Sequence, residues 1–300
     1  MHLKKNSDPR MTFRRHKGSF ETLLTSFIRG KKSGSDLDLW EVIRYSLQNG
    51  GKRVRPILCK VIVESLGGSS VDYSQLSVEF FHTASLIADD MPCMDNDDFR
   101  RGSLSSHKKF GEAKALLASY ALISWGYEAV NLAARRFTEA TGDVKRGYET
   151  LSIALERVSF LAGLDGAVSG QHLDLFGHPE TMDDFRDIIY KKTATLFSLS
   201  FEMGWIFGGG DLSKLESVEK MAIHFGTFFQ MVDDFQDRGR EEEKSNIVRF
   251  LGLKQAKEEI FFHKNAFLQS TKKLGIECPE FAFIIDYIEK KSDLANASFF

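Results

Sequence analysis

Two clusters of acidic residues stand out in the sequence, and each follows an apolar segment. The first, from Ala88 to Gly102, reads ADDMPCMDNDDFRRG and holds five carboxylates followed by two adjacent arginines. The second, from Gln230 to Asp237, reads QMVDDFQD. Carboxylate oxygens are the ligands that Mg²⁺ takes in proteins, and the ion keeps other positions for water or phosphate. One acidic helix end is commonly just solvated, but two such clusters together indicate a metal site.

The second cluster has the spacing of a helix face. Asp233 and Asp237 are four residues apart, so they share one side of a helix, and Gln230 lies one turn before them on that side. Like charges stacked in this way repel one another and reduce stability unless a cation offsets them. The spacing therefore favours a bound divalent ion.

The first cluster is less regular. Asp89 and Asp95 are six residues apart, and Pro92 between them disfavours an unbroken helix. We expect a helix that ends or distorts just past Asp90, with Asp95 folding back toward Asp89. An EF-hand loop is excluded, because the segment from Asp89 to Arg100 lacks the sharp-turn glycine and the terminal glutamate.

Basic and amide residues elsewhere could complete such a site. The segment 50–56 reads GGKRVRP and places three cations in four residues, and His82 lies two helical turns before Asp89. Lys192, in YKKTAT, interrupts an apolar helix, so it needs an anionic partner or an exit to solvent. Together with GQHLDL at 170–175, these features suggest a helical cavity with two acidic walls, two cationic patches and an apolar floor. A diphosphate with a hydrocarbon tail would fit that cavity.

The segments that must position these residues are predicted to be helical. Apolar residues recur at helical spacing through most of the chain, and several segments are apolar nearly all round, which is typical of buried helices. No run of alternating strands, repeat or low-complexity linker interrupts them. We predict an all-α fold with a single domain, a large helical bundle around a central cavity at 19–300. Residues 1–18, MHLKKNSDPRMTFRRHKG, are expected to form a basic, flexible tail, with a transit peptide as the alternative.

Composition narrows the range of functions. The formal net charge of −2 gives no general reason to expect nucleic-acid binding. Three widely spaced cysteines without a CxxC motif argue against disulfides and a zinc site and fit a reducing compartment. No apolar run reaches the roughly 18 residues of a membrane span. We expect a cytoplasmic enzyme.

As a set, the motifs resemble the trans-polyprenyl diphosphate synthases. GGKRVRP, DDMPCMDNDDFRRG, GQHLDL, KT and QMVDDFQD occur in the order and at the spacing of that family, from about Phe20 to at least Asp237. The four residues between Asp90 and Asp95 match the bacterial and plastid branch of short-chain enzymes. The resemblance implies a Mg²⁺-dependent transferase. It would condense isopentenyl diphosphate with dimethylallyl, geranyl or farnesyl diphosphate by ionisation, condensation and elimination.

The resemblance also implies roles for individual residues. The metal ligands would be Asp89, Asp90, Asp95, Asp233, Asp234 and Asp237. They would hold about three Mg²⁺ ions with substrate bound. The diphosphate of isopentenyl diphosphate would be bound by Lys52, Arg55, His82 and Arg101. The allylic diphosphate would be bound by Arg100, Lys192, Thr193, Gln230 and Lys244. Of these, Lys192, Thr193 and Gln230 would act catalytically near the breaking C–O bond.

The chain departs from the family after the second cluster. Only DRGREEEKSNIVRFLG follows there, where family members carry a longer loop with two lysines. Lys244 could correspond to either lysine, and Arg238 or Arg240 could substitute for one of them. This difference leaves the role of Lys244 open.

Product length depends on the residues before the first cluster. Ser85 and Ala84 lie four and five residues before Asp89, where the family forms the floor of the pocket for the growing tail. Both are small, which favours a geranylgeranyl (C20) product over a farnesyl (C15) product. Deeper aromatic residues could still close the pocket, and the candidates are Phe80, Phe81, Tyr120 and Trp125.

Two other functions compete with this interpretation. A class I terpene cyclase shares the all-α fold, but it normally lacks a second aspartate cluster of this type and has no need of GGKRVRP. A non-catalytic homologue could serve as the regulatory subunit of a heteromeric synthase, although such subunits typically lose one cluster. The family resemblance further implies a homodimer.

Overall fold

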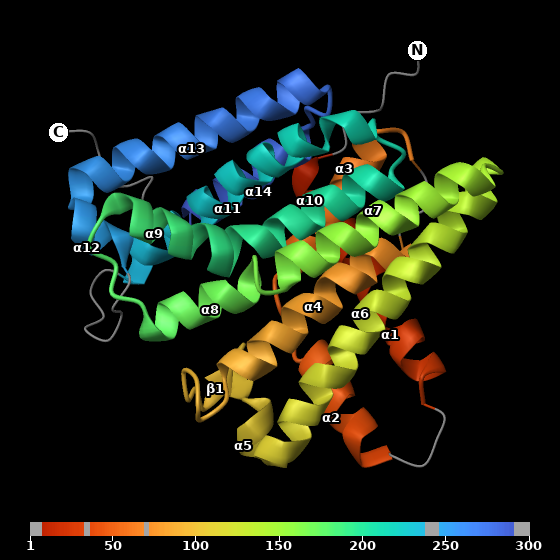
Figure 1. Cartoon of the computed structure of the whole chain (residues 1–300), viewed down its shortest axis with the longest axis horizontal. Helices are drawn as coiled ribbons and strands as arrows, with labels where there is room; N and C mark the ends of the chain where they lie inside the picture. The colour runs from red at the N-terminus through yellow and green to blue at the C-terminus, as the bar shows by residue number, and fades with distance from the viewer. Residues whose placement is uncertain (1–7, 33–36, 69–71, 238–245, 291–300) are drawn as a thin grey trace.

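The computed structural model describes residues 8–32, 37–68, 72–237 and 246–290, and within them the chain is almost entirely helical (Figure 1). The long helices are α1 (Pro9–Gly30), α2 (Leu37–Gln48), α3 (Val54–Ser65), α4 (Asp72–Asp89), α6 (Glu112–Thr141), α7 (Val144–Ala162), α8 (Ala167–Phe176), α10 (Thr195–Phe207), α11 (Leu215–Asp237), α13 (Leu253–Leu274) and α14 (Pro279–Lys290). The short helical segments are α5 (Ser106–Phe110), α9 (Met182–Ile189), the π-helix η1 (Tyr190–Ala194), η2 (Leu212–Lys214) and α12 (Ile247–Leu251). The prediction of an all-α, single-domain bundle is confirmed.

Helix α10 forms the centre of the bundle. Every one of its residues is buried, and it packs against α3, α4, α7 and α11 (Figure 1). An apolar helix with no polar face needs neighbours on all sides, which is why its sequence, TLFSLSFEMGWIF, has no solvent stripe. Helices α4 and α11, which carry the two acidic clusters, both contact α10 and thereby face the same interior region.

The N-terminal region corrects one prediction. Residues 9–18 are not a flexible tail, because they form the first half of α1, where Thr12 and His16 are buried. Asp8 accepts a hydrogen bond from the backbone N–H of Arg10, and Pro9 occupies the first helical turn, a combination that favours helix initiation. The ring of Phe13 packs against aromatic residues of α14. Residues 1–7 lie outside the described part.

A single short hairpin interrupts the helices of the described segments. Strand β1 (Phe99–Arg100) pairs with β2 (Ser103–Leu104) directly after the first acidic cluster. Its two turn residues, Arg101 and Gly102, both have positive φ, as a type I′ turn requires. The sequence analysis missed this hairpin because each strand has only two residues. Among the described helices, none is long and apolar enough to cross a membrane.

Candidate active site

The first acidic cluster begins where α4 ends. The helix terminates at Asp89, and a turn then brings the backbone N–H of Asp95 within 2.9 Å of the carbonyl oxygen of Asp89. Asn96 has a φ of +54°, and its N–H donates to the carbonyl of Met91. Asp95 therefore folds back toward Asp89, as the spacing and Pro92 predicted.

Burial dominates the electrostatics of this cluster. Burial raises the pKa of the Asp89 carboxyl to about 7, against the opposing effect of Lys192. Burial also raises the pKa of Asp95. Asp90 turns inward, with only 3% of its surface exposed, and accepts a hydrogen bond of 2.7 Å from Nε of Arg100. Ionisation of Asp89 and Asp95, the two partly open carboxylates, is therefore unfavourable. A cation bound beside them would offset that cost.

The second cluster lies on regular helix near the end of α11. Asp234 is the inward member of the pair, since its carboxylate accepts hydrogen bonds from Nε2 of Gln230 and from the N–H of Ile247. Asp233 instead lines a small cavity together with Lys52, Phe229 and Tyr287. Asp237 is the last residue of α11, and its side chain lies outside the described part.

The π-helix η1 places two of the predicted catalytic residues. It inserts one extra residue per turn between α9 and α10, a distortion that often occurs at functional sites. Thr193 donates a hydrogen bond of 2.7 Å to Oε1 of Gln230, so the structure brings these two together across α11. Lys192 forms an ion pair with Asp174 of α8, the anionic partner that its burial required.

Helix α8 connects η1 to the first cluster. Gly170 allows close approach, because a Cβ there would lie 2.2 Å from the backbone nitrogen of Lys192. At the next residue, Nε2 of Gln171 lies 3.5 Å from Oδ1 of Asp95. The carboxylates of Asp174, Asp95 and Asp89 outweigh burial and raise the pKa of Lys192, so it stays a cation. The sequence assigned no role to Asp174; its spacing from Gln171 was the only signal.

A pocket of about 490 Å³ lies between the GGKRVRP loop and the first cluster. It is lined by Gly51, Lys52, Arg53, Val54, Arg55, Glu79, His82, Leu86, Arg100, Arg101 and Phe229. All four residues predicted to bind isopentenyl diphosphate therefore line one cavity, and Arg100 adjoins them.

Arg55 and His82 are the least satisfied polar groups of this pocket. Arg55 packs its guanidinium 4.0 Å from the ring centre of Phe197, and its buried Nε has no hydrogen-bond partner. The buried Nδ1 of His82 also has none. Burial lowers the pKa of Arg55 to about 10 and that of His82 well below its usual range. Basic side chains that line a cavity and are incompletely paired suit an anionic ligand.

The residues below the first cluster fall on two faces of α4. Ser85 lies one turn below Asp89 on the same face and is half-buried, whereas Ala84 packs toward α6, where its carbonyl accepts a hydrogen bond from Ser119. Of the deeper aromatic residues, Phe81 lies on the Ser85 face and packs against Tyr127. The other three lie elsewhere: Phe80 and Trp125 pack together with Phe27, and Tyr120 is 59% exposed. Lys244, Arg238 and Arg240 lie outside the described residues.

The carboxylates present suit Mg²⁺ only with further ligands. Within the described ranges, no three His, Cys, Asp or Glu side chains are grouped closely enough to hold a metal ion by themselves. Mg²⁺ is usually bound through one or two carboxylates together with water and substrate phosphates, so an oxygen-only, incomplete donor set fits that ion. Asp89 and Asp95 on one side and Asp233 on the other are the carboxylates that could take part.

Comparison with known proteins identifies the family. The family model described as polyprenyl synthetase matches residues 38–248. The chain belongs to this family. A farnesyl diphosphate synthase of Geobacillus stearothermophilus is 32% identical over 290 residues, which cover 91% of this chain and 94% of that protein. The prediction of a short-chain prenyl diphosphate synthase, a transferase by class, is confirmed at the level of the family.

Other relatives are consistent with this assignment. The large subunit 1 of a heterodimeric geranylgeranyl pyrophosphate synthase of Arabidopsis thaliana is 40% identical over 203 residues, which cover 67% of this chain and 54% of the longer plant protein. A crystal structure of a geranyltransferase from Legionella pneumophila superposes with a TM-score of 0.80 at 26% identity, covering 96% of this chain and 98% of that one. An FPP/GFPP synthase from Zymomonas mobilis gives a TM-score of 0.77 at 27% identity, covering 92% and 99%.

Proposed function

We propose that this polyprenyl synthetase is a Mg²⁺-dependent prenyltransferase that joins isopentenyl diphosphate to allylic diphosphates and makes geranylgeranyl diphosphate as its main product. The observation that carries the proposal is the pocket between the GGKRVRP loop and the first carboxylate cluster. Lys52, Arg55, His82 and Arg101 line it together. An anion site beside two incomplete metal sites matches two diphosphate substrates, one bound by cations of the protein and one through Mg²⁺.

Each group of residues would do one part of the work. Lys52, Arg55, His82 and Arg101 would hold isopentenyl diphosphate in the pocket. Asp89, Asp95 and Asp233, with Asp90, Asp234 and Asp237 in support, would hold about three Mg²⁺ ions on the allylic diphosphate. Bound Mg²⁺ would neutralise charge on the leaving group. Arg100 and Lys192, each already paired with an aspartate, would turn toward the same diphosphate. Lys244 is proposed to bind the allylic diphosphate as well.

The oxygens near η1 would meet the developing carbocation. The hydroxyl of Thr193 and the amide oxygen of Gln230 are joined by a hydrogen bond, which fixes both close to the interior. Partial negative charges that are already oriented stabilise positive charge without reorganisation. The aromatic rings of Phe197 and Phe229, packed with centroids 4.9 Å apart, form an apolar wall that would keep water from the cation.

A homodimer forms part of the proposal. Helix α6 exposes a stripe of five large apolar side chains: Leu116, Leu117, Tyr120, Ile123 and Tyr127. All of them except Leu117 recur at the spacing of one helical face. A patch of this kind on a monomer marks an interface, and a two-fold axis would cover it with the same patch of a second chain. The expected cytoplasmic location rests on the sequence and is tested by cell fractionation.

The proposal is tested by a product assay on the purified chain. Isopentenyl diphosphate is supplied with dimethylallyl, geranyl or farnesyl diphosphate, with Mg²⁺ or with excess chelator, and product length is measured by mass spectrometry. We expect C20 product only with Mg²⁺, and a dimeric mass by light scattering on the same sample. A C15 product alone would overturn the chain-length proposal and retain the reaction.

The second candidate, a non-catalytic regulatory subunit, predicts a different result. Two of the Arabidopsis relatives are large subunits of heterodimeric synthases, which makes a heteromer a specific alternative. No elongation from any primer by the isolated chain, despite a folded protein, would favour that alternative over our proposal.

A further inference from the structure

The loop that carries the pocket's cations has an unusual backbone. Between α2 and α3, Gly50 and Gly51 have positive φ, and so does Arg53, at 56°. Among the described residues other than glycine, only Arg53, Asn96 and Arg101 have positive φ. Such residues are strained and persist only when surrounding contacts enforce them. Two of the three are arginines that line the same pocket, so something must hold them there.

Glu79 of α4 contacts both strained arginines. Its side chain is 1% exposed, and Oε1 pairs with Nη1 of Arg53 and lies 3.6 Å from Nη2 of Arg101. Arg53 also donates a hydrogen bond of 2.5 Å from Nη2 to the carbonyl of Leu47, the penultimate residue of α2. The arginine thus joins the end of α2 to the middle of α4, directly beneath the loop.

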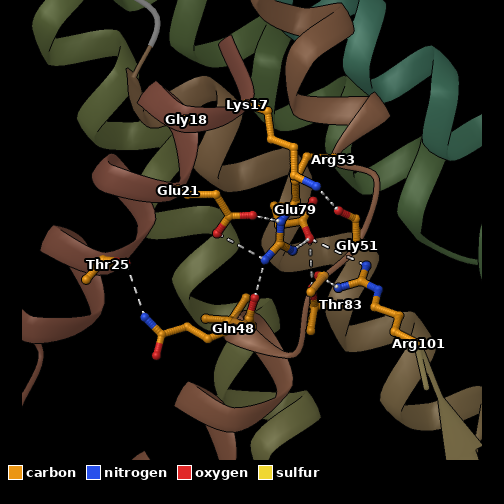
Figure 2. Close-up of polar contacts among 12 residues, drawn as sticks. Lys17, Gly18, Glu21, Thr25, Gln48, Gly51, Arg53, Glu79, Thr83 and Arg101 are labelled. Atoms are coloured by element: carbon orange, nitrogen blue, oxygen red, sulfur yellow. Dashed lines mark hydrogen bonds and ion pairs between the residues drawn. The ribbon is translucent and has the colours of Figure 1, made fainter. Parts of the chain in front are cut away.

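Helix α1 supplies the remaining contacts, as Figure 2 shows. Glu21 accepts a hydrogen bond of 2.8 Å from Nε of Arg53, and Nζ of Lys17 donates one of 2.7 Å to the carbonyl of Gly51. Arg101 approaches the loop from the other side and donates to the carbonyl of Gly50 at 2.9 Å. Gly51 has a φ of +122°, which favours glycine, and a Cβ there would lie 2.9 Å from the guanidinium carbon of Arg101, whose side chain would have to shift.

The charges in this cluster offset one another. Glu21 and Glu79 balance Arg53 and Arg101, and their carboxylates outweigh burial so that the pKa of Arg53 is raised. Glu79 lines the pocket proposed to bind an anion, but Arg53 and Arg101 neutralise its negative charge. Lys52, an exposed neighbour of Arg53, and Arg55 remain directed at the pocket from either side of the strained residue.

We propose that Glu79 and Glu21, acting through Arg53, are positioning residues that hold the GGKRVRP loop in the geometry in which Lys52, Arg55 and Arg101 bind the diphosphate of isopentenyl diphosphate. This inference rests on the proposed function for the identity of that ligand. The loop itself is short and glycine-rich, so without these two carboxylates it would populate other conformations. Helix α1, whose first half was expected from its sequence to be a tail, becomes part of the substrate site through Glu21 and Lys17.

The primary test is Glu21→Gln, because Glu21 is 36% exposed and the variant should fold. We expect KM for isopentenyl diphosphate to rise about tenfold, since small displacements of binding groups have large effects. KM for the allylic substrate should stay within about twofold, because Asp89 and Asp233 are untouched. The matched control is Glu128→Gln, which removes the ion pair between Glu128 of α6 and Lys31, the residue that follows α1.

A second variant covers the buried pair. Glu79→Gln alone would leave Arg53 with a buried, partly unpaired charge, so the double variant Glu79→Gln with Arg53→Met removes both charges together. Its KM for isopentenyl diphosphate should rise at least as much as that of Glu21→Gln. Equal changes in both KM values, or an unchanged KM for isopentenyl diphosphate in a folded protein, would overturn the positioning role.

Calorimetric titration with inorganic diphosphate separates this inference from the proposed reaction. Binding by the wild type that weakens in Glu21→Gln but not in Glu128→Gln supports the positioning role, even if no prenyl product forms. A wild type that binds no inorganic diphosphate and no isopentenyl diphosphate overturns it, because no diphosphate site would then exist.

Discussion

The two carboxylate clusters are built in different ways. The first is formed by a helix end and a turn that contains a residue at positive φ, Asn96. The second lies on the uninterrupted helix α11. Both share one arrangement: the second aspartate of each Asp-Asp pair, Asp90 or Asp234, turns inward and is held by the protein, while the first stays partly open. A regular and an irregular backbone can thus present the same arrangement of carboxylates.

The surroundings one turn before each cluster differ as well. On α4 this position is Ser85, which is small, whereas on α11 it is Phe229, whose ring packs on Phe197. We therefore expect the first wall to leave room for the hydrocarbon tail of the proposed substrate, and the second to close the site with an aromatic surface. We therefore predict that both clusters are needed equally for turnover with Mg²⁺. Only the surroundings of the first cluster are expected to determine product length.

The largest expected effect tests that equality. Asp89→Asn and Asp233→Asn should each lower kcat by about a thousandfold or more, because each removes charge that positions the leaving group's counter-ions. Steady-state assays at saturating substrates and varied Mg²⁺ measure this loss. The control is Asp183→Asn, an exposed aspartate of α9 that pairs only with Arg186 among the described residues. Near-normal turnover in one of the two cluster variants would show that the clusters are not equivalent.

An intermediate effect concerns product length. Ser85→Phe should convert C20 product to C15 or shorter with little change in stability, because the ring would enter the side of α4 that carries Asp89 and Phe81. Ala84→Phe should also shorten the product, but at a cost of about 1–3 kcal/mol in unfolding free energy, since it overpacks the contact with α6. Product analysis and thermal melting separate the two. The control is Ser152→Phe, at an exposed position of α7. An unchanged product from both variants would show that the small side chains of Ser85 and Ala84 do not determine product length.

The smallest expected effect concerns the backbone of the first cluster, which turns at Asn96, in comparison with the helical backbone of the second. Asn96→Val places a β-branched residue at positive φ, which costs about 1–2 kcal/mol and should raise the half-saturating Mg²⁺ concentration several-fold. The matched change on the regular cluster's helix, Ser217→Val at an exposed position of α11, should cost only a few tenths of a kcal/mol. Asn96→Gly should behave like the wild type. Equal Mg²⁺ requirements in Asn96→Val and the wild type would show that the turn is not needed for metal binding.

The regular half of the site was predictable from sequence. Helical spacing placed Gln230 one turn before Asp234, to which its amide donates a hydrogen bond, and Pro92 predicted the end of α4 near Asp90. These inferences depend on local geometry alone. The helical bundle followed from apolar periodicity for the same reason, whereas the first half of α1 was missed because its basic residues concealed a capped helix with a buried stripe.

Long-range partners could not be predicted in this way. The inward turn of Asp234 depends on the N–H of Ile247, and the ion pair of Lys192 depends on Asp174, 18 residues away. The burial of Ala84 against α6 depends on how two helices cross. None of these contacts has a spacing rule, because each is decided by tertiary packing.

The π-helix at Tyr190–Ala194 has a consequence for how this chain can vary. One additional residue in a helical turn rotates everything beyond it by about 100° relative to an α-helix. Because α10 is buried on every side, its register cannot absorb such a rotation. Gain or loss of a single amino acid within η1 would therefore either misplace Thr193 or misalign the central helix. Natural variation in this segment should proceed by substitution, while insertions and deletions are confined to the loops.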